Sequence, residues 1–253
     1  MIHDAAAIRD PGWYSPAYAA WQRMVMPRIA QGARAVIVPS AFSRDEVVEL
    51  LGAERERVEV IPGGADESFS PAVDPGPART ALGLERPYVL SVGGMTARKN
   101  FAVLEEVATR LSPDGVEVVV AGGQRRELAA GRPVTGVRYL GRVPEPLLPG
   151  LYSGARAFVL PSLHEGFGLT ALEALKSGLP VVVAKRGALP ELCGEAATYV
   201  DPLDAEAIAA RSAAAIDRST PVAASLERAG RFSWERTAAR VDALLARLLG
   251  PEP

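Results

Sequence analysis

The sequence has little cysteine, few lysines and no long apolar run. One cysteine, Cys193, stands among 253 residues, so an internal disulfide is excluded and a reducing compartment fits best. No apolar stretch reaches the roughly 18 residues that a membrane-spanning helix needs. The opening residues carry both charge signs before Pro11, which is not the pattern of a signal peptide. These features predict a cytoplasmic chain.

An excess of one charge sign is also lacking. The chain has 28 basic and 30 acidic residues, a net charge of −2, whereas a nucleic-acid binder normally shows a strong basic excess. We therefore expect no nucleic-acid partner. Only three of the basic residues are lysines, Lys99, Lys176 and Lys185.

Metal-ligand patterns are missing as well. No Asp-x-Asp occurs, and two histidines with one cysteine provide no cluster of typical metal ligands. We expect neither a metal nor another cofactor. Negative charge on a leaving group would then be neutralised by arginine, lysine and helix dipoles.

What the sequence does have is an ordinary globular balance, with 48% apolar and 23% charged residues. Short apolar runs followed by helical patterns predict an α/β fold with parallel strands, because strands covered on both faces need not alternate in polarity. The predicted strands are 35–39, 58–62, 88–92, 116–121, 137–140, 157–160, 180–184 and 198–200.

Helical patterns lie between these strands. Ser43 with Glu46 three residues later predicts a capping box for a helix over 43–51. Asn100 is the predicted cap of a helix over 100–111. Further helices are predicted over 170–176, 205–216 and 237–249.

The chain divides at a segment rich in proline, glycine and aspartate. Residues 73–86 read as a linker. The six predicted strands that follow are enough for a complete Rossmann-like domain over 87–233. Residues 1–72 contain only two strands and read as a partial domain, while 234–253 form a C-terminal helix.

Two loops carry the candidate chemistry. Residues 91–100 pass from a strand through Gly93 and Gly94 to Arg98, Lys99 and a predicted helix start. Glycines allow close backbone approach, and helix N-terminal N–H groups with two cations suit a phosphate. Taken alone, this segment is better interpreted as a solvated Arg-Lys pair at a helix start, since it matches neither a Walker A loop nor GxGxxG.

The second loop holds His164, Glu165 and the Gly-Phe-Gly of 166–168, before a helix that contains Glu173. Loops at the carboxyl ends of strands are where ligands bind in open α/β sheets. If Glu165 lies over the helix start, both carboxylates face one cleft and can accept hydrogen bonds from sugar hydroxyls. Glu173 as a surface carboxylate and His164 as a loop histidine are the simpler readings.

These residues resemble family 4 of the retaining glycosyltransferases. The resemblance rests on the Glu165-x7-Glu173 pair and on Arg98-Lys99-Asn100, and weaker matches cover nearly the whole chain. It implies the GT-B fold, in which two Rossmann-like domains face a cleft, with the start of the N-terminal domain absent here. A further departure is Gly94, which stands where many members have an arginine.

The resemblance also implies roles. Lys99, Glu165 and His3 would be catalytic, with His3 near the transferred sugar. Glu173 would hold the ribose, and the loop around Arg142 and Val143 would meet the base. The remaining donor-binding residues would be Gly93, Gly94, Arg98, Gly166, Phe167, Gly168 and Leu169, the backbone N–H groups of 167–169 holding the phosphates.

The function that follows is metal-independent, retaining transfer of a hexose from a GDP- or UDP-linked donor to an acceptor hydroxyl. The acceptor would be a carbohydrate, a lipid-linked compound or another alcohol. Two alternatives stay open: a nucleotide-sugar binding module that needs a separate acceptor domain or partner chain, and a nucleotide-sugar epimerase.

An aromatic cluster, Trp13, Tyr14, Tyr18 and Trp21, lies within nine positions. Packing in the core of the first domain is the preferred interpretation. An acceptor-facing surface and a peripheral membrane or partner contact are the alternatives.

Overall fold

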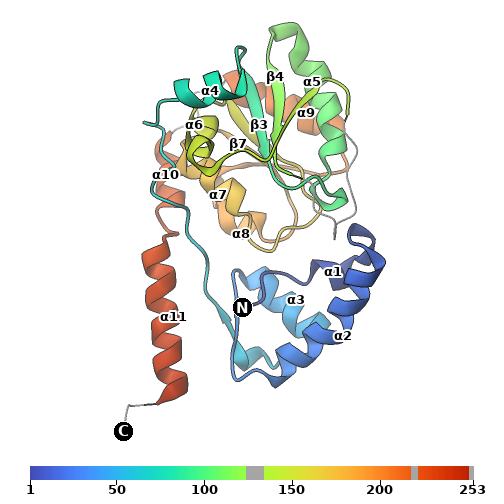
Figure 1. The fold of residues 1–253 in the computed structure, drawn as a ribbon, viewed down its shortest axis with the longest axis vertical. Coiled ribbons are helices and arrows are strands. Elements are labelled where there is room, and N and C mark those ends of the chain that lie inside the picture. The colour runs from blue at the N-terminus through green and yellow to red at the C-terminus, as the bar shows by residue number, and fades with distance from the viewer. Residues whose placement is uncertain (124–133, 218–221, 251–253) are drawn as a thin grey trace.

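The computed structural model describes residues 1–123, 134–217 and 222–250. It contains a six-stranded domain and a smaller, two-stranded domain built mainly from residues 1–62 (Figure 1). The two loops that carry the candidate chemistry, residues 91–100 and 164–168, lie inside the described residues, as do all the predicted strands.

The six-stranded sheet is parallel throughout. Its strands are β3 (Tyr88–Val92), β4 (Glu117–Ala121), β5 (Val137–Gly141), β6 (Ala157–Leu160), β7 (Val181–Ala184) and β8 (Thr198–Val200). They lie in the order β5-β4-β3-β6-β7-β8, the order of a doubly wound Rossmann-type sheet. The predicted α/β fold class is confirmed, and each predicted strand agrees with the structure to within two residues.

Both faces of this sheet are covered, which explains the continuous apolar runs. Leu90 and Phe158 belong to one buried cluster, which helices α6 (Leu148–Ser153), α7 (Leu169–Lys176) and α8 (Leu189–Cys193) complete. Their neighbours Val89 and Val159 face α5 (Leu104–Leu111) and α9 (Ala205–Asp217) in a second cluster. Alternate residues of one strand thus serve two cores.

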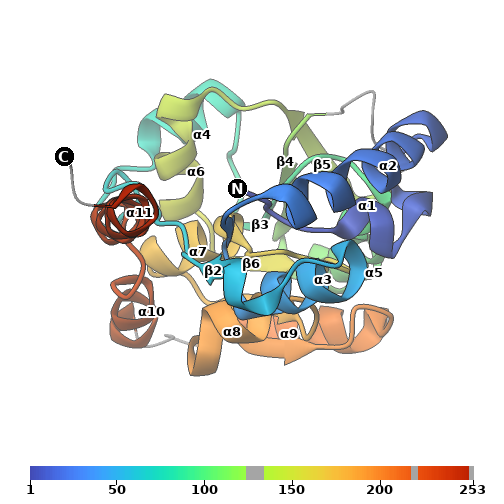
Figure 2. The same cartoon turned by 90° about the horizontal axis from the view of Figure 1, so that it is seen from below.

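The two-stranded domain is smaller. β1 (Val36–Val38) and β2 (Val58–Val60) pair in parallel, and their apolar side chains pack with residues of α2 (Pro16–Gly32) and α3 (Ala41–Leu51). The short α1 (Ala6–Arg9) precedes α2. Figure 2 shows α2 and the C-terminal helix on opposite sides of this domain.

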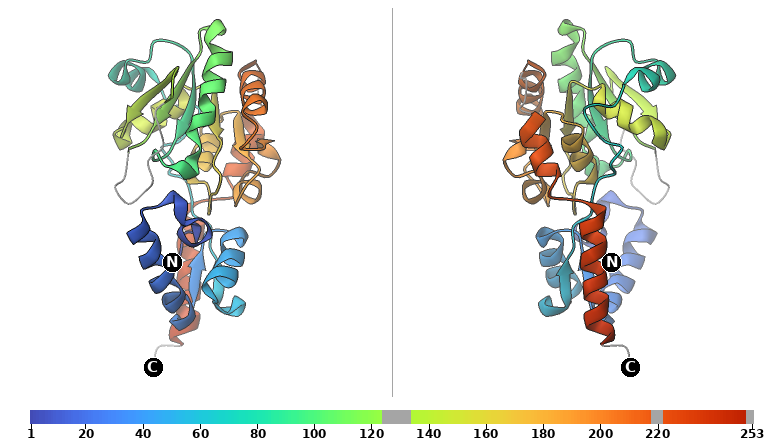
Figure 3. Two further views of the ribbon diagram at one scale, coloured as in Figure 1. Left: turned by 90° about the vertical axis from the view of Figure 1, so that its right-hand side faces the viewer. Right: turned by 90° about the vertical axis from the view of Figure 1, so that its left-hand side faces the viewer.

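The C-terminal helix, α11 (Trp234–Leu249), follows α10 (Val222–Ala229) and runs back along the two-stranded domain (Figure 3). Thr237 Oγ1 donates to the Pro62 carbonyl at 2.7 Å, and Arg240 donates to the Val60 carbonyl at 2.7 Å. A side chain at Gly64 would meet the backbone of Ser233 and Trp234. The chain passes between the domains twice, near Gly64 and near Ser233, and these two segments are in close contact.

Two predicted helix starts are wrong. The cap of α3 is Ser40, whose hydroxyl accepts from the Ser43 N–H at 2.9 Å, and Glu46 is engaged elsewhere. Asn100 caps no α-helix: it has a left-handed φ of 55°, and its amide donates to the carbonyls of Pro161 and Pro202. Only a 3-10 turn spans Ala97–Lys99, and α5 begins at Leu104.

The predicted linker is partly helical. Within residues 73–86, α4 (Gly76–Leu82) packs on α6, and Ala78 is buried beside Gly150. Local sequence hid this helix because glycine and proline occupy its first turn. Among the described residues, no helix is long and apolar enough to cross a membrane.

We expect Ser40→Ala to lower the free energy of unfolding by about 1 kcal/mol, the usual cost of losing an N-cap. The same hydroxyl donates to the Gly166 carbonyl at 2.6 Å, so the loss should lie at or above that figure. Urea unfolding measures it. Thr109→Ala, on the exposed face of α5, is the control and should change stability by less than about 0.5 kcal/mol; equal effects of the two variants would contradict the capping role.

Candidate functional site

The candidate site lies where the strand order of the large sheet reverses. β3 and β6 are neighbours at the centre of the sheet, yet one connects toward β4 and the other toward β7. Loops that leave such strands diverge and open a crevice at their carboxyl ends. Lys99 follows β3 and Glu165 follows β6, so the topology brings the two predicted loops together.

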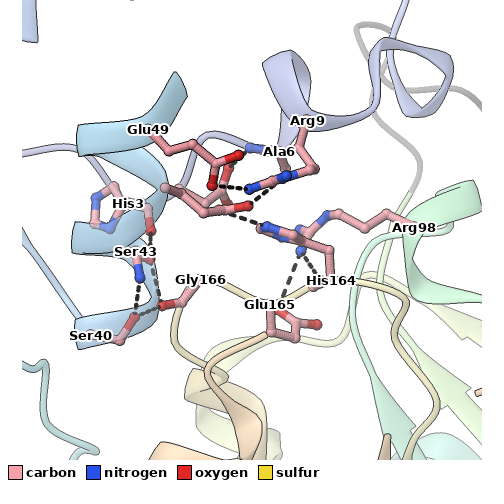
Figure 4. Close-up of polar contacts among 12 residues, drawn as sticks. His3, Ala6, Arg9, Ser40, Ser43, Glu49, Arg98, His164, Glu165 and Gly166 are labelled. Atoms are coloured by element: carbon pink, nitrogen blue, oxygen red, sulfur yellow. Dashed lines mark hydrogen bonds and ion pairs between the residues drawn. The ribbon is translucent and has the colours of Figure 1, made fainter. Parts of the chain in front are cut away.

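A buried ion triad forms the centre of this site. Lys99 Nζ lies 2.6 Å from Glu165 Oε1, and Arg98 Nη1 lies 3.3 Å from Glu165 Oε2. Lys99 and Glu165 are 8% and 6% exposed. Arg98 also donates to the His164 carbonyl at 2.6 Å (Figure 4). The solvated Arg-Lys pair considered above is therefore wrong, since these cations hold the Glu165 loop.

The triad is electrically unbalanced. Burial by itself would raise the pKa of Glu165, but the charges of Lys99 and Arg98 outweigh it and lower that pKa to about 2. The three side chains together carry a formal net charge of +1, and the charge of Asp4 also acts on Arg98. An excess of positive charge in a largely dry place attracts an anion.

Glycine makes room for the triad. A side chain at Gly93 would meet Lys99 Cε at 2.8 Å, and one at Gly187 would meet the Glu165 carbonyl at 2.4 Å. Gly187 also has a left-handed φ of 59°. Gly94 is less crowded, since a side chain there would lie 3.4 Å from the Gly123 carbonyl and 3.8 Å from Thr96 Cγ2.

The start of α7 borders the triad. Gly168 has a φ of 100° and immediately precedes the helix, whose first residue, Leu169, is 41% exposed. The first N–H groups of a helix have no acceptor within it. The Phe167 ring packs against Phe232 at 5.9 Å between centroids.

Glu173 lies on α7 and is largely buried. Its Oε2 accepts from the Tyr152 hydroxyl at 2.6 Å. Burial raises the pKa of Glu173 to about 7, although the Tyr152 hydrogen bond and the charge of Lys99 act in the opposite direction. Glu173 is thus near enough to Lys99 for the lysine charge to act on its pKa. It is not the surface carboxylate that the sequence also allowed.

The loop after β5 is placed less favourably for its predicted role. Arg142 is exposed beside Gly123, while Val143 is buried in the core of the six-stranded domain. A base could therefore meet the Arg142 side chain or the backbone of this loop, but not the Val143 side chain.

His3 does not reach the triad. It is exposed, and its imidazole ring points away from Glu165 (Figure 4). Its carbonyl instead lies 3.2 Å from Ser43 Oγ, whose proton has a nearer acceptor in the Gly166 carbonyl at 2.9 Å. Close approach still occurs here, because a side chain at Gly166 would meet the His3 carbonyl at 2.3 Å and Asp4 Cβ at 2.7 Å.

A cavity of about 440 Å³ lies in the two-stranded domain, with Arg98 as the one described lining residue from the other domain. His3 lines this cavity too, so it shares the cavity with Arg98 although it does not contact Glu165. Arg98 and Asp4 line it together with Tyr14 and Tyr18, whose rings stack at 5.5 Å between centroids. Burial raises the pKa of Tyr14 to about 12, with the nearby Asp4 adding to the rise.

The preferred interpretation of the aromatic cluster is wrong. Trp13, Tyr14 and Tyr18 are only partly buried, and Trp21 is 49% exposed beside Met24 at 56%. The cluster lines the cavity at one end and faces solvent at the other.

One contact between the two domains, that of His164 with Glu46, was not indicated by any pattern in the sequence. His164 is buried, and its Nε2 lies 2.8 Å from Oε2 of Glu46 in the other domain. In the same region Glu191 accepts from the N–H groups of Ala41 and Phe42, at 2.8 and 3.1 Å. Residues more than 100 positions apart meet here, and spacing along the chain cannot indicate such a pair.

Comparison with known families is decisive for the kind of protein. Residues 86–218 match the family described as glycosyl transferases group 1, and residues 1–69 match glycosyltransferase family 4. The chain belongs to the group 1 glycosyltransferases. Its resemblance to family 4 and its GT-B type fold are thereby confirmed.

This glycosyltransferase is similar to several curated proteins. It is 30% identical over 92% of its length to O-antigen chain mannosyltransferase B of Escherichia coli, of which it covers 66%. It is 33% identical over 87% of its length to D-inositol 3-phosphate glycosyltransferase of Mycolicibacterium smegmatis, of which it covers 53%. The chain spans about half to two thirds of the length of such relatives.

Solved structures agree on the fold. HepE of Anabaena, in complex with UDP and glucose, superposes with a TM-score of 0.78 at 20% identity, over 97% of this chain and 70% of that one. Sucrose-phosphate synthase of Thermosynechococcus elongatus gives 0.73 at 27% identity, over 91% and 62%. The epimerase alternative has no support among these glycosyltransferases.

The triad predicts a pH-dependent stability. Lys99→Ala should destabilise the protein by about 3 kcal/mol at pH 7, because it leaves a buried carboxylate short of one partner. The depressed pKa of Glu165 stabilises the fold above the ordinary pKa of 4.5, and this contribution is lost as pH falls toward about 2. The gap between wild type and variant should therefore shrink over that range in urea unfolding. A gap that is constant with pH, or an equal gap for the exposed Lys185→Ala, would contradict the assignment.

Proposed function

We propose that this group 1 glycosyltransferase moves a hexose from a GDP- or UDP-linked donor to an acceptor hydroxyl, with retention and without a metal. The observation that carries the proposal is the buried Lys99–Glu165–Arg98 triad at the switch point of the sheet. The solved HepE complexes with UDP and UDP-glucose support the donor class.

The charge balance of the triad suits a diphosphate. Its net charge of +1 would meet the two negative charges of the donor, with Lys99 nearest the phosphates and Arg98 beside it. The N–H groups at 167–169 add the positive end of α7. Together they would stabilise the charge that develops on the leaving nucleotide.

The carboxylates would bind the hydroxyls of the donor. Glu165 accepts hydrogen bonds from the sugar, and Glu173 accepts them from the ribose. With its low pKa and two cationic partners, Glu165 is a weak nucleophile, which favours transfer without a covalent sugar–enzyme intermediate.

Transfer would then occur on one face of the sugar. The bond between the anomeric carbon and the phosphate oxygen breaks, and the acceptor oxygen bonds to that carbon from the same side. The acceptor proton passes to the leaving phosphate oxygen. No metal is required for this balance, and among the described residues no three His, Cys, Asp or Glu side chains gather as a metal site.

The acceptor would enter through the cavity beside Arg98. Its stacked Tyr14 and Tyr18 suit a carbohydrate or lipid-linked alcohol. The exposed Trp21 and Met24 nearby fit peripheral membrane contact from the cytoplasm, or a partner chain. A second candidate function, a donor-binding module that needs a separate acceptor domain, is favoured by the two-stranded sheet of the smaller domain.

We expect Lys99→Ala and Glu165→Ala each to weaken donor binding at least tenfold, because each removes an interaction worth more than about 1.4 kcal/mol. Calorimetry against a panel of UDP- and GDP-linked sugars, in the presence of EDTA, measures this and identifies the donor. Lys185→Ala is the matched control. Wild-type affinity in both variants would overturn the site, and binding that appears only when a divalent ion is restored would overturn the metal-independent reaction.

Donor binding should also depend on pH through Glu173. With a pKa of about 7, its ionised fraction rises about tenfold between pH 6 and pH 8. The ionised form can accept a ribose hydroxyl on each oxygen without donating, whereas the protonated form must donate from one of them. The diphosphate of a nucleotide sugar does not titrate in this range. Affinity should therefore rise by up to about tenfold in wild type and stay flat in Glu173→Gln. A parallel rise in both would assign the dependence to another group.

A further inference from the structure

A buried charged cluster joins α3 to the loop that carries Glu165. His164 and Glu46 are 4% and 2% exposed, and His164 Nε2 lies 2.8 Å from Glu46 Oε2. The other Glu46 oxygen accepts from Arg9 Nε at 3.0 Å. Figure 4 shows two of the residues of this cluster, Arg9 and His164, above Glu165 in the view drawn.

Glu46 provides the hydrogen-bond partner of the His164 ring among the described residues. Phe42 and Trp13 contact the ring through their faces and edges, at 5.3 and 5.9 Å between centroids. The second ring nitrogen, Nδ1, is buried without a hydrogen-bond partner among the described residues. One polar contact, made to the other domain, therefore fixes the ring.

The backbone of His164 transmits its position to the triad. Its carbonyl accepts from Arg98 Nη1 at 2.6 Å, and the same guanidinium lies 3.3 Å from the Glu165 carboxylate. His164 is also covalently next to Glu165. A displaced ring would thus move the Glu165 carboxylate and its partner Arg98 together. Glu173 and the start of α7 follow this loop in the chain, so we expect them to keep their positions.

We propose that Glu46 is a positioning residue for the donor sugar: through His164 it holds Glu165 and Arg98 in the geometry that binds the sugar. This inference rests on the proposed function. It assigns the two-stranded domain a share in sugar recognition, separate from nucleotide recognition.

Other contacts keep α3 in place when the Glu46 charge is removed. Ser40 and Ser43 donate to the Gly166 carbonyl at 2.6 and 2.9 Å, and Glu191 accepts from the first N–H groups of α3. The isosteric Glu46→Gln should therefore shift the ring without separating the domains.

Calorimetry with paired probes tests the proposal. UDP is compared with UDP-glucose, and GDP with GDP-mannose, for wild type and Glu46→Gln. We expect the variant to bind the nucleotide sugar at least about fivefold more weakly and the bare nucleotide within about twofold of wild type. Glu49→Gln is the matched control, because Glu49 pairs with the same Arg9 on the exposed surface, and it should change neither affinity.

A second variant separates positioning from general loosening. His164→Gln keeps a donor group near Nε2 and should retain most of the sugar affinity, whereas His164→Leu should lose as much as Glu46→Gln. The double variant Glu46→Gln/His164→Leu should lose no more than either single change, because both break one contact.

The outcomes are distinct. An unchanged ratio of sugar to nucleotide affinity in Glu46→Gln, or an equal loss of both, overturns the positioning role while leaving the proposed function intact. Failure of the wild-type protein to bind any of the four probes overturns the proposed function, and this inference with it.

Discussion

The buried ion triad of Lys99, Glu165 and Arg98 is the interaction on which the rest of the site depends. Ionised groups in so dry a place are tolerated only when they are paired, so the two loops that supply them are tied to one another. The tie explains the glycines around them, since Gly93 and Gly187 leave space that the lysine and the Glu165 backbone occupy. It also leaves one positive charge in excess, which a bound anion can neutralise.

The positions of the strands followed from the sequence because their physical cause is local, whereas their order in the sheet was not predicted. A strand buried on both faces must be apolar at every position, and the runs at β3, β4, β6 and β7 show this directly. Helix starts were less certain. Ser40 and Ser43 are both able to cap α3, and only tertiary structure selects Ser40, because its hydroxyl also reaches Gly166 in the other domain.

The same distinction between local and tertiary causes applies to the residues of the site. Lys99 and Glu165 could be proposed from sequence because each stands at the end of a recognisable strand, and strand order brings the ends together. Neither Glu46 nor the exposure of His3 could be foreseen, since both depend on how one domain rests on the other. For Asn100 the sequence predicted a helix cap, but its side-chain amide instead donates to the carbonyls of Pro161 and Pro202.

Contact between the domains has a consequence for the chemistry. Gly166 meets the backbone of His3, and its carbonyl accepts two serine hydroxyls from α3. The loop that holds Glu165 is therefore fastened on one side to its own sheet, through Arg98, and on the other to the smaller domain. A carboxylate held from two domains keeps its geometry only while the domains stay together. The geometry of the carboxylate that we propose to bind the donor sugar thus depends on both parts of the chain, even though the ion triad belongs to only one.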